Sequence, residues 1–108
     1  MSKIKLLHKD KEYFAEFTRN TAKAIEERGF NLELIGSQPN KMIPLLIQGA
    51  FMKNHPTLKY QKVEEVYLAQ THKGDLIGKL AEMYAETVNS LVGNEEEDDG
   101  KNATWEIV

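Results

Sequence analysis

The chain of 108 residues has the length of about one domain, and its 41% hydrophobic and 29% charged residues are typical of a soluble protein. It contains no cysteine, which excludes disulfides and thiolate metal sites. The longest uncharged stretch, residues 42–52, is 11 residues long, far short of the roughly 20 that span a bilayer. We therefore expect a protein that does not enter the membrane.

The net charge of −3 is unevenly placed along the sequence. Residues 94–108 contain six acidic residues and one basic residue, whereas residues 1–93 contain 13 basic and 11 acidic residues. Five adjacent acidic residues, 95–99, repel one another and bury little apolar area. This pattern predicts a folded domain over residues 1–93 and a disordered acidic tail over 94–108. The chain has no basic stripe, so nucleic acid is not an expected partner.

The first predicted elements are two short strands, residues 3–8 and 12–17, which form an antiparallel hairpin. Apolar residues alternate along both segments, as they do in strands with one buried face. A helix over residues 19–28 follows, with Thr18 as its N-cap. Gly29 is expected to end this helix, because the position after a helix often needs a positive φ.

Residues 30–34 alternate between apolar and polar, which fits either a short strand or an apolar connector. After a polar loop, Asn40 is expected to cap a helix over residues 41–54, with Pro44 still inside its first turn. Apolar residues occupy most sides of this helix, so we expect it to be central and buried.

Two further helices are predicted over residues 61–71 and 75–92, the second with the most regular helical spacing in the chain. Within it, Gly78 is interpreted as a position of close helix packing. The predicted fold is therefore α+β: an N-terminal β-hairpin packed on a bundle of about four helices, followed by the disordered acidic C-terminal tail.

The sequence contains no recognisable pattern of catalytic or metal-binding residues. His8, His55 and His72 are scattered without metal-ligand spacing, and we expect them at the surface or at helix ends. Gly74 and Gly78 resemble part of a phosphate-binding loop, but three residues separate them where four are required. We therefore expect no enzymatic activity, no cofactor and no metal.

Apolar residues that the core does not need are the candidates for partner binding. One group belongs to the second helix and the segment after it; the other lies beyond the acidic run. The alternatives to partner binding are core packing for the first group and a tail folded back on the same domain for the second. As a partner-binding peptide, the second group would add to a sheet edge or enter a groove. The candidates are Phe51, Met52, Tyr60, Trp105, Ile107 and Val108.

Several short segments follow one another in a characteristic order along the chain. They are Glu16-Phe17-Thr18-Arg19, Arg28-Gly29-Phe30, Gln48-Gly49-Ala50-Phe51 with His55, and residues 76–84, which read LIGKLAEMY. In this order they resemble small proteins encoded in the tail-gene clusters of phages and prophages of Gram-positive bacteria. The resemblance covers nearly the whole chain and includes the acidic tail with its closing Trp.

Proteins of this kind are regarded as tail assembly chaperones. The resemblance implies a non-enzymatic protein in the host bacterial cytoplasm that binds the tape-measure protein, with the tail-tube protein as a second partner. Such a chaperone would be absent from the finished virion. The alternative is a structural tail or neck component that stays in the particle. The sequence leaves open whether copies of the chain form a homo-oligomer.

Overall fold

The N-terminal segment folds into the predicted β-hairpin. The computed structural model describes residues 3–92, with side chains through residue 89. Strand β1 (Ile4–His8) pairs antiparallel with β2 (Lys11–Ala15). The two turn residues, Lys9 and Asp10, have φ angles of 51° and 65°. Positive φ at both positions is typical of a type I′ turn, whose twist matches the twist of the two strands. Glycine or asparagine usually occupies such positions, and neither is present here.

One face of the hairpin is buried, as the alternation predicted. Leu6 lies opposite Tyr13 in the register, and both are buried together with Ala15. Phe17, just beyond β2, continues this apolar surface and is 2% exposed. The hairpin therefore contributes one side of the hydrophobic core rather than projecting from it.

Helix α1 (Arg19–Glu27) begins and ends at the predicted caps. The Thr21 N–H donates to the Thr18 hydroxyl at 3.1 Å, and the Thr18 N–H donates to the Thr21 hydroxyl at 3.0 Å. This reciprocal pair satisfies two amides that the helix start leaves without intrahelical partners. Gly29 has a φ of 104°, so the residue after the helix adopts the conformation for which glycine is favoured.

We expect Thr18→Ala to lower the free energy of unfolding by about 1 kcal/mol, because it removes the hydroxyl partner of the Thr21 amide. Urea unfolding followed by circular dichroism measures this change. Thr57→Ala, an exposed threonine in the loop after α2, is the matched control and should stay within about 0.5 kcal/mol. Equal midpoints for the two variants would show that the cap does not stabilise the fold.

The segment after α1 forms a short 3₁₀ helix, η1 (Leu32–Leu34), and not a strand. The Asn31 side chain accepts a hydrogen bond from the Glu33 N–H at 3.0 Å, which starts the turn. Leu32 and Leu34 are half-buried and pack against the core. The segment therefore agrees better with the predicted apolar connector than with the predicted short strand.

Helix α2 (Pro39–Met52) begins before the expected residue. Pro39 occupies the first helical position, where its fixed φ fits and no N–H is needed. Gln38 precedes it without a side-chain cap, so the predicted capping role of Asn40 is wrong. Pro44 consequently lies beyond the first turn, and it has no N–H to donate to the Asn40 carbonyl.

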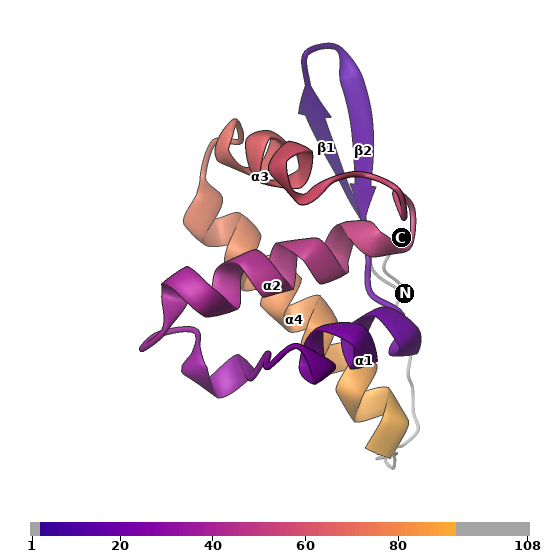
Figure 1. Cartoon of the computed structure of the whole chain (residues 1–108), viewed down its shortest axis with the longest axis vertical. Coiled ribbons are helices and arrows are strands. Elements are labelled where there is room, and N and C mark those ends of the chain that lie inside the picture. The colour runs from indigo at the N-terminus through magenta and orange to yellow at the C-terminus, as the bar shows by residue number, and fades with distance from the viewer. Residues whose placement is uncertain (1–2, 93–108) are drawn as a thin grey trace, which may run out of the picture.

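Helix α2 is central in the fold, as expected. It contacts α1, α3 (Tyr60–Leu68), α4 (Lys73–Val92), β2 and η1. Figure 1 shows the hairpin and α3 at one end, α1 on the other side of α2, and α4 passing behind them. Helices α3 and α4 both begin slightly earlier than predicted. The largest fully buried side chains are Phe17, Ile25, Met42, Leu46, Ile47, Phe51, Val66 and Leu80.

The glycine that permits close packing is Gly49 and not Gly78. Gly78 is exposed, and over residues 3–92 no atom of another element lies within 4 Å of a Cβ built on it, so the packing interpretation is wrong. At Gly49 the same Cβ would lie 2.9 Å from Cγ2 of Ile25 and 3.0 Å from Cε1 of Phe17. Helices α1 and α2 therefore approach each other as closely as they do because position 49 has no side chain.

Candidate functional site

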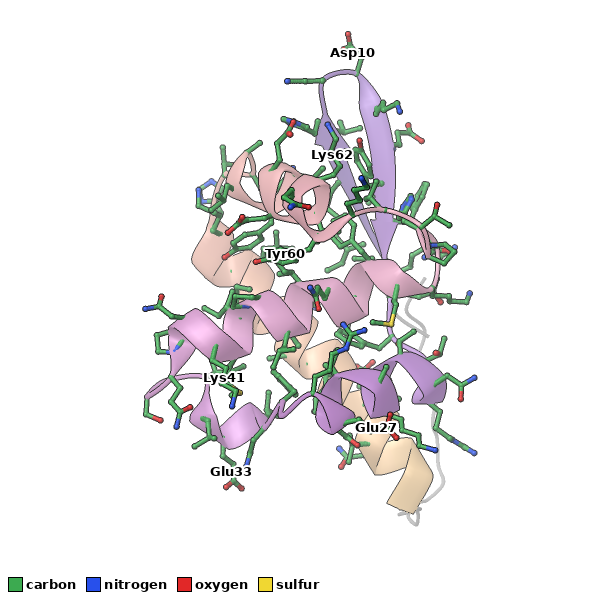
Figure 2. All side chains as sticks on the ribbon, viewed as in Figure 1. Asp10, Glu27, Glu33, Lys41, Tyr60 and Lys62 are labelled. Atoms are coloured by element: carbon green, nitrogen blue, oxygen red, sulfur yellow. The ribbon has the colours of Figure 1, made fainter. Side chains whose placement is uncertain are left out.

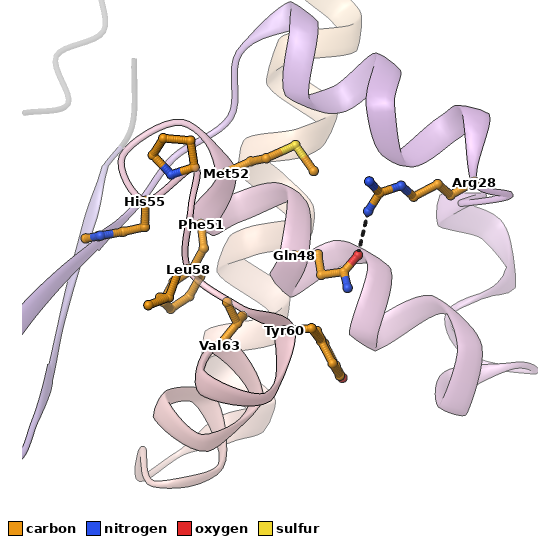
Figure 3. A pocket seen from close by; sticks show the side chains of 9 residues that line it. Arg28, Gln48, Phe51, Met52, His55, Leu58, Tyr60 and Val63 are labelled. Carbon is orange, nitrogen blue, oxygen red and sulfur yellow. Dashed lines mark hydrogen bonds between the residues drawn. The ribbon is translucent and has the colours of Figure 1, made fainter.

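A cleft of about 230 Å³ lies between the end of α2, the loop over residues 53–59 and the start of α3. Figure 3 shows its lining side chains, which converge from these three segments and from the end of α1. Three residues predicted to bind a partner are among them: Phe51, Met52 and Tyr60. The lining residues are Arg28, Gln48, Phe51, Met52, His55, Pro56, Leu58, Tyr60 and Val63.

Helical spacing and one turn place these side chains together. Residues three and four apart lie on one face of a helix, so Gln48, Phe51 and Met52 form one wall. The chain then reverses in a turn in which the Leu58 N–H donates to the His55 carbonyl at 3.1 Å, with Pro56 at the second position. The turn brings the loop and the first residues of α3 to face the end of α2.

The predicted site residues differ in how accessible they are. Phe51 is 2% exposed, so the expectation of an exposed apolar contact is wrong for this residue. Its ring packs 6.2 Å from Tyr13 and 5.9 Å from His55, measured between centroids, and lies at the floor of the cleft. Met52 and Tyr60 are half-buried and accessible. The remaining candidates, Trp105, Ile107 and Val108, lie outside the described residues.

Polar groups occur at the mouth of the cleft. The Arg28 guanidinium donates to the Gln48 side-chain oxygen at 2.9 Å and joins α1 to α2 (Figure 3). Burial, followed by the Glu64 carboxylate, raises the pKa of Tyr60. Among the described residues that line the cleft, Arg28 is the only lysine or arginine, and none is acidic. An apolar side chain flanked by a carbonyl or carboxylate group would fit these surroundings.

His55 holds the hairpin against the helices, a role that the sequence analysis missed. The Phe14 N–H donates to His55 Nε2 at 3.0 Å, and Asn54 Nδ2 donates to the Phe14 carbonyl at 3.4 Å. These two side chains satisfy the outward-facing backbone groups of Phe14 on the edge of β2. A strand of another chain would have to displace them, so this edge is protected against added strands.

Residues 16–17, just beyond β2, and residues 49–50 of α2 meet in the structure. The Glu16 N–H donates to the Ala50 carbonyl at 2.9 Å, and Phe17 packs beside Gly49. The Glu16 carboxylate is buried; it accepts from Asn54 Nδ2 at 3.2 Å and lies 3.4 Å from the Lys53 ammonium. These contacts fix the end of α2, which forms one wall of the cleft.

A cluster of charged residues joins the hairpin turn to α3. His8 Nε2 lies 2.7 Å from the Glu65 carboxylate, with the Lys62 and Lys9 ammonium groups at 3.3 and 3.6 Å. Figure 2 shows Lys62 beside the hairpin, below Asp10 at the tip of the turn. The hydrogen bond from His8, followed by that from Lys62, lowers the pKa of Glu65 to about 2. His8 is therefore a partner of a carboxylate and not a plain surface residue.

The stability of this junction is expected to depend on pH. Because the pKa of Glu65 falls from 4.5 to about 2 on folding, its contribution is fully present above pH 4.5 and is lost as the pH falls towards 2. We expect Glu65→Gln to have a lower melting temperature than the parent at neutral pH. Melting curves at a series of pH values should show the difference in melting temperature between the two proteins shrinking as the pH falls from 4.5 to about 2. A difference that stays constant would contradict the role assigned to Glu65.

The described residues provide neither a metal site nor a membrane segment. Over residues 3–92 no three histidine, aspartate or glutamate side chains are grouped so that they could hold a metal ion. No helix in this part of the chain is long and apolar enough to cross a bilayer.

Residues 3–92 form a small α+β domain of one hairpin and four α-helices, with a cleft of mixed polar and apolar lining at the α2–α3 junction. The family model described as "Domain of unknown function (DUF5055)" matches residues 1–108, so the chain belongs to the DUF5055 family. No curated protein and no solved structure matches the chain.

Proposed function

We propose that this protein is a non-enzymatic assembly chaperone that binds the tape-measure protein of a phage tail in the host cytoplasm. The resemblance of the sequence segments to phage tail-cluster proteins supplies the identity of the client. The cleft lined by Met52, Leu58 and Tyr60 supplies the binding surface and is the observation on which the proposal rests.

The shape and chemistry of the cleft suit a helical client. A helix presents apolar side chains at every third or fourth residue, and grooves on partner proteins receive them singly. A cleft of about 230 Å³ has room for one large side chain of this kind, with the Arg28 guanidinium beside it to pair with an acidic neighbour. Covering such side chains before assembly would keep a long apolar helix from aggregating.

The charge distribution supports the same role. The acidic run at 95–99 gives the complex a surplus of negative charge, and net charge away from zero favours solubility. The body of the chain carries a small positive surplus, which leaves its apolar surfaces free of strong repulsion towards a client. Tail-tube protein is the second partner in this proposal.

Co-expression with the tape-measure protein of the same gene cluster tests the proposal. We expect the tape-measure protein to become soluble and to co-purify. Met52→Gln keeps the length of the side chain but makes it polar, and should weaken binding roughly tenfold, since about 1.4 kcal/mol corresponds to that factor. Leu68→Gln alters a leucine that is 56% exposed and lies outside the cleft, so it serves as the control.

Equal capture by the two variants would place the interface elsewhere on the molecule. Mass spectrometry of purified virions separates the chaperone from a structural tail or neck component. A chaperone should be missing from the particle, whereas a structural component would be present in stoichiometric copies, which would contradict the proposal.

A further inference from the structure

A second hollow, distinct from the cleft, lies where η1 and the end of α1 face the last turns of α4. Its volume is about 380 Å³. In Figure 1 α1 crosses the later half of α4, and η1 continues from it. We call this second hollow the α4 groove. Its lining residues are Glu26, Phe30, Asn31, Leu32, Glu33, Tyr84, Ala85, Val88 and Asn89.

The α4 groove has an apolar floor and acceptors at its rim. The rings of Phe30 and Tyr84 are buried and meet edge to face with centroids 4.9 Å apart. The Tyr84 hydroxyl donates to the Glu26 carboxylate, which fixes the tyrosine ring in place. Leu32 and Val88 are half-buried and leave apolar surface open to solvent.

The sequence places an apolar segment within reach of this groove. Asn89 lines the groove, and the last described residue of α4, Val92, follows it by three positions, about 4.5 Å along the helix. Twelve residues, 93–104, separate Val92 from Trp105. A coil of this length has an end-to-end distance of roughly 20 Å, and extended it covers up to about 40 Å.

Tethering makes even weak docking effective. A short linker holds the attached segment at an effective concentration in the millimolar range, so a site with millimolar affinity is already substantially occupied. The segment at 105–108 contains a tryptophan and two β-branched apolar residues, Ile107 and Val108. A tryptophan needs an acceptor for its indole N–H when it is buried, and the carboxylates of Glu26 and Glu33 stand at the rim.

We propose that residues 105–108 dock in the α4 groove of the same chain, with the Trp105 indole on the floor formed by Phe30, Tyr84 and Val88. The linker carries the acidic residues 95–99, which repel Glu26 and Glu33. Screening of this repulsion by salt should therefore strengthen the docking. This inference does not depend on the identity of the client.

The fluorescence of Trp105 tests the proposal directly, because it is the only tryptophan in the chain. In the full-length protein we expect an emission maximum at shorter wavelength than in urea, and protection from acrylamide quenching. Val88→Glu places a charge in the groove. It should shift the emission maximum and the acrylamide quenching of Trp105 to the values of the unfolded chain. Leu32→Gln, from the opposite wall, should do the same if Val88→Glu fails to fold.

Ile77→Glu is the matched control, since this half-buried residue lies on the same helix outside the groove. It should leave emission and quenching unchanged, with circular dichroism confirming that each variant is folded. Solvent-exposed emission in the parent protein, or equal protection in all folded variants, would overturn the proposal. Protection that is lost on dilution would also overturn it, because the occupied groove would then belong to a second copy of the chain.

Discussion

Replacement of Phe51 by alanine is expected to lower the free energy of unfolding by about 3–5 kcal/mol. The side chain is 2% exposed, and its ring packs against Tyr13 of the hairpin and His55 of the loop. Removal of the ring would leave a cavity at the point where α2, the hairpin and the loop meet. Chemical unfolding of the variant and the parent measures the loss, which is a large fraction of the stability of a small domain.

The control for this experiment is Leu68→Ala, which removes an apolar side chain that is 56% exposed. It should change the stability by no more than about 0.5 kcal/mol. A Phe51→Ala variant that kept the stability of the parent but lost the tape-measure protein would reverse the assignment. Phe51 would then be a contact residue of the interface and not a core residue.

Gly49→Ala is expected to destabilise the protein by about 1–3 kcal/mol, although alanine is the better helix former. The new methyl group would lie about 3 Å from atoms of Ile25 and Phe17. Both side chains are buried and surrounded, so neither can move aside without displacing α1 or the end of the hairpin. Thermal unfolding of the variant measures the cost.

Gly78→Ala is the natural comparison, because it makes the same substitution within an exposed stretch of α4. Among the residues that the structure describes, no atom of another element lies within 4 Å of the added carbon, so only the helix propensity changes. We expect a gain of about 0.5–1 kcal/mol. A gain in stability at both glycines would show that the contact between α1 and α2 is looser than the structure describes.

Local features of the fold were predictable from the sequence because they depend on neighbouring residues. Thr18 and Gly29 mark the ends of α1 through a hydroxyl acceptor and a positive φ, and both are visible in the sequence. The burial of α2 on most sides followed from the apolar residues that occupy most of its circumference. The predicted start of α2 was wrong because asparagine is a common N-cap. In the structure Pro39, one residue before Asn40, already occupies the first helical position.

The features that could not be predicted depend on contacts between distant segments. Gly49 and Gly78 are both helical glycines, and only the position of α1 distinguishes them. The link from His55 to Phe14 spans 41 residues and has no local sequence pattern. The apolar character of Phe51, Met52 and Tyr60 predicts that they contact a partner, but it does not predict that they line one cleft. The turn at Pro56 places them there.

The most direct test of the proposed function is a pull-down of co-expressed tape-measure protein by the parent, Met52→Gln and Leu68→Gln proteins. We predict that the parent and Leu68→Gln retain the tape-measure protein in the soluble fraction, whereas Met52→Gln retains far less of it. If the tape-measure protein stayed insoluble with all three proteins, the chaperone function would be contradicted. A structural role in the particle would then take its place.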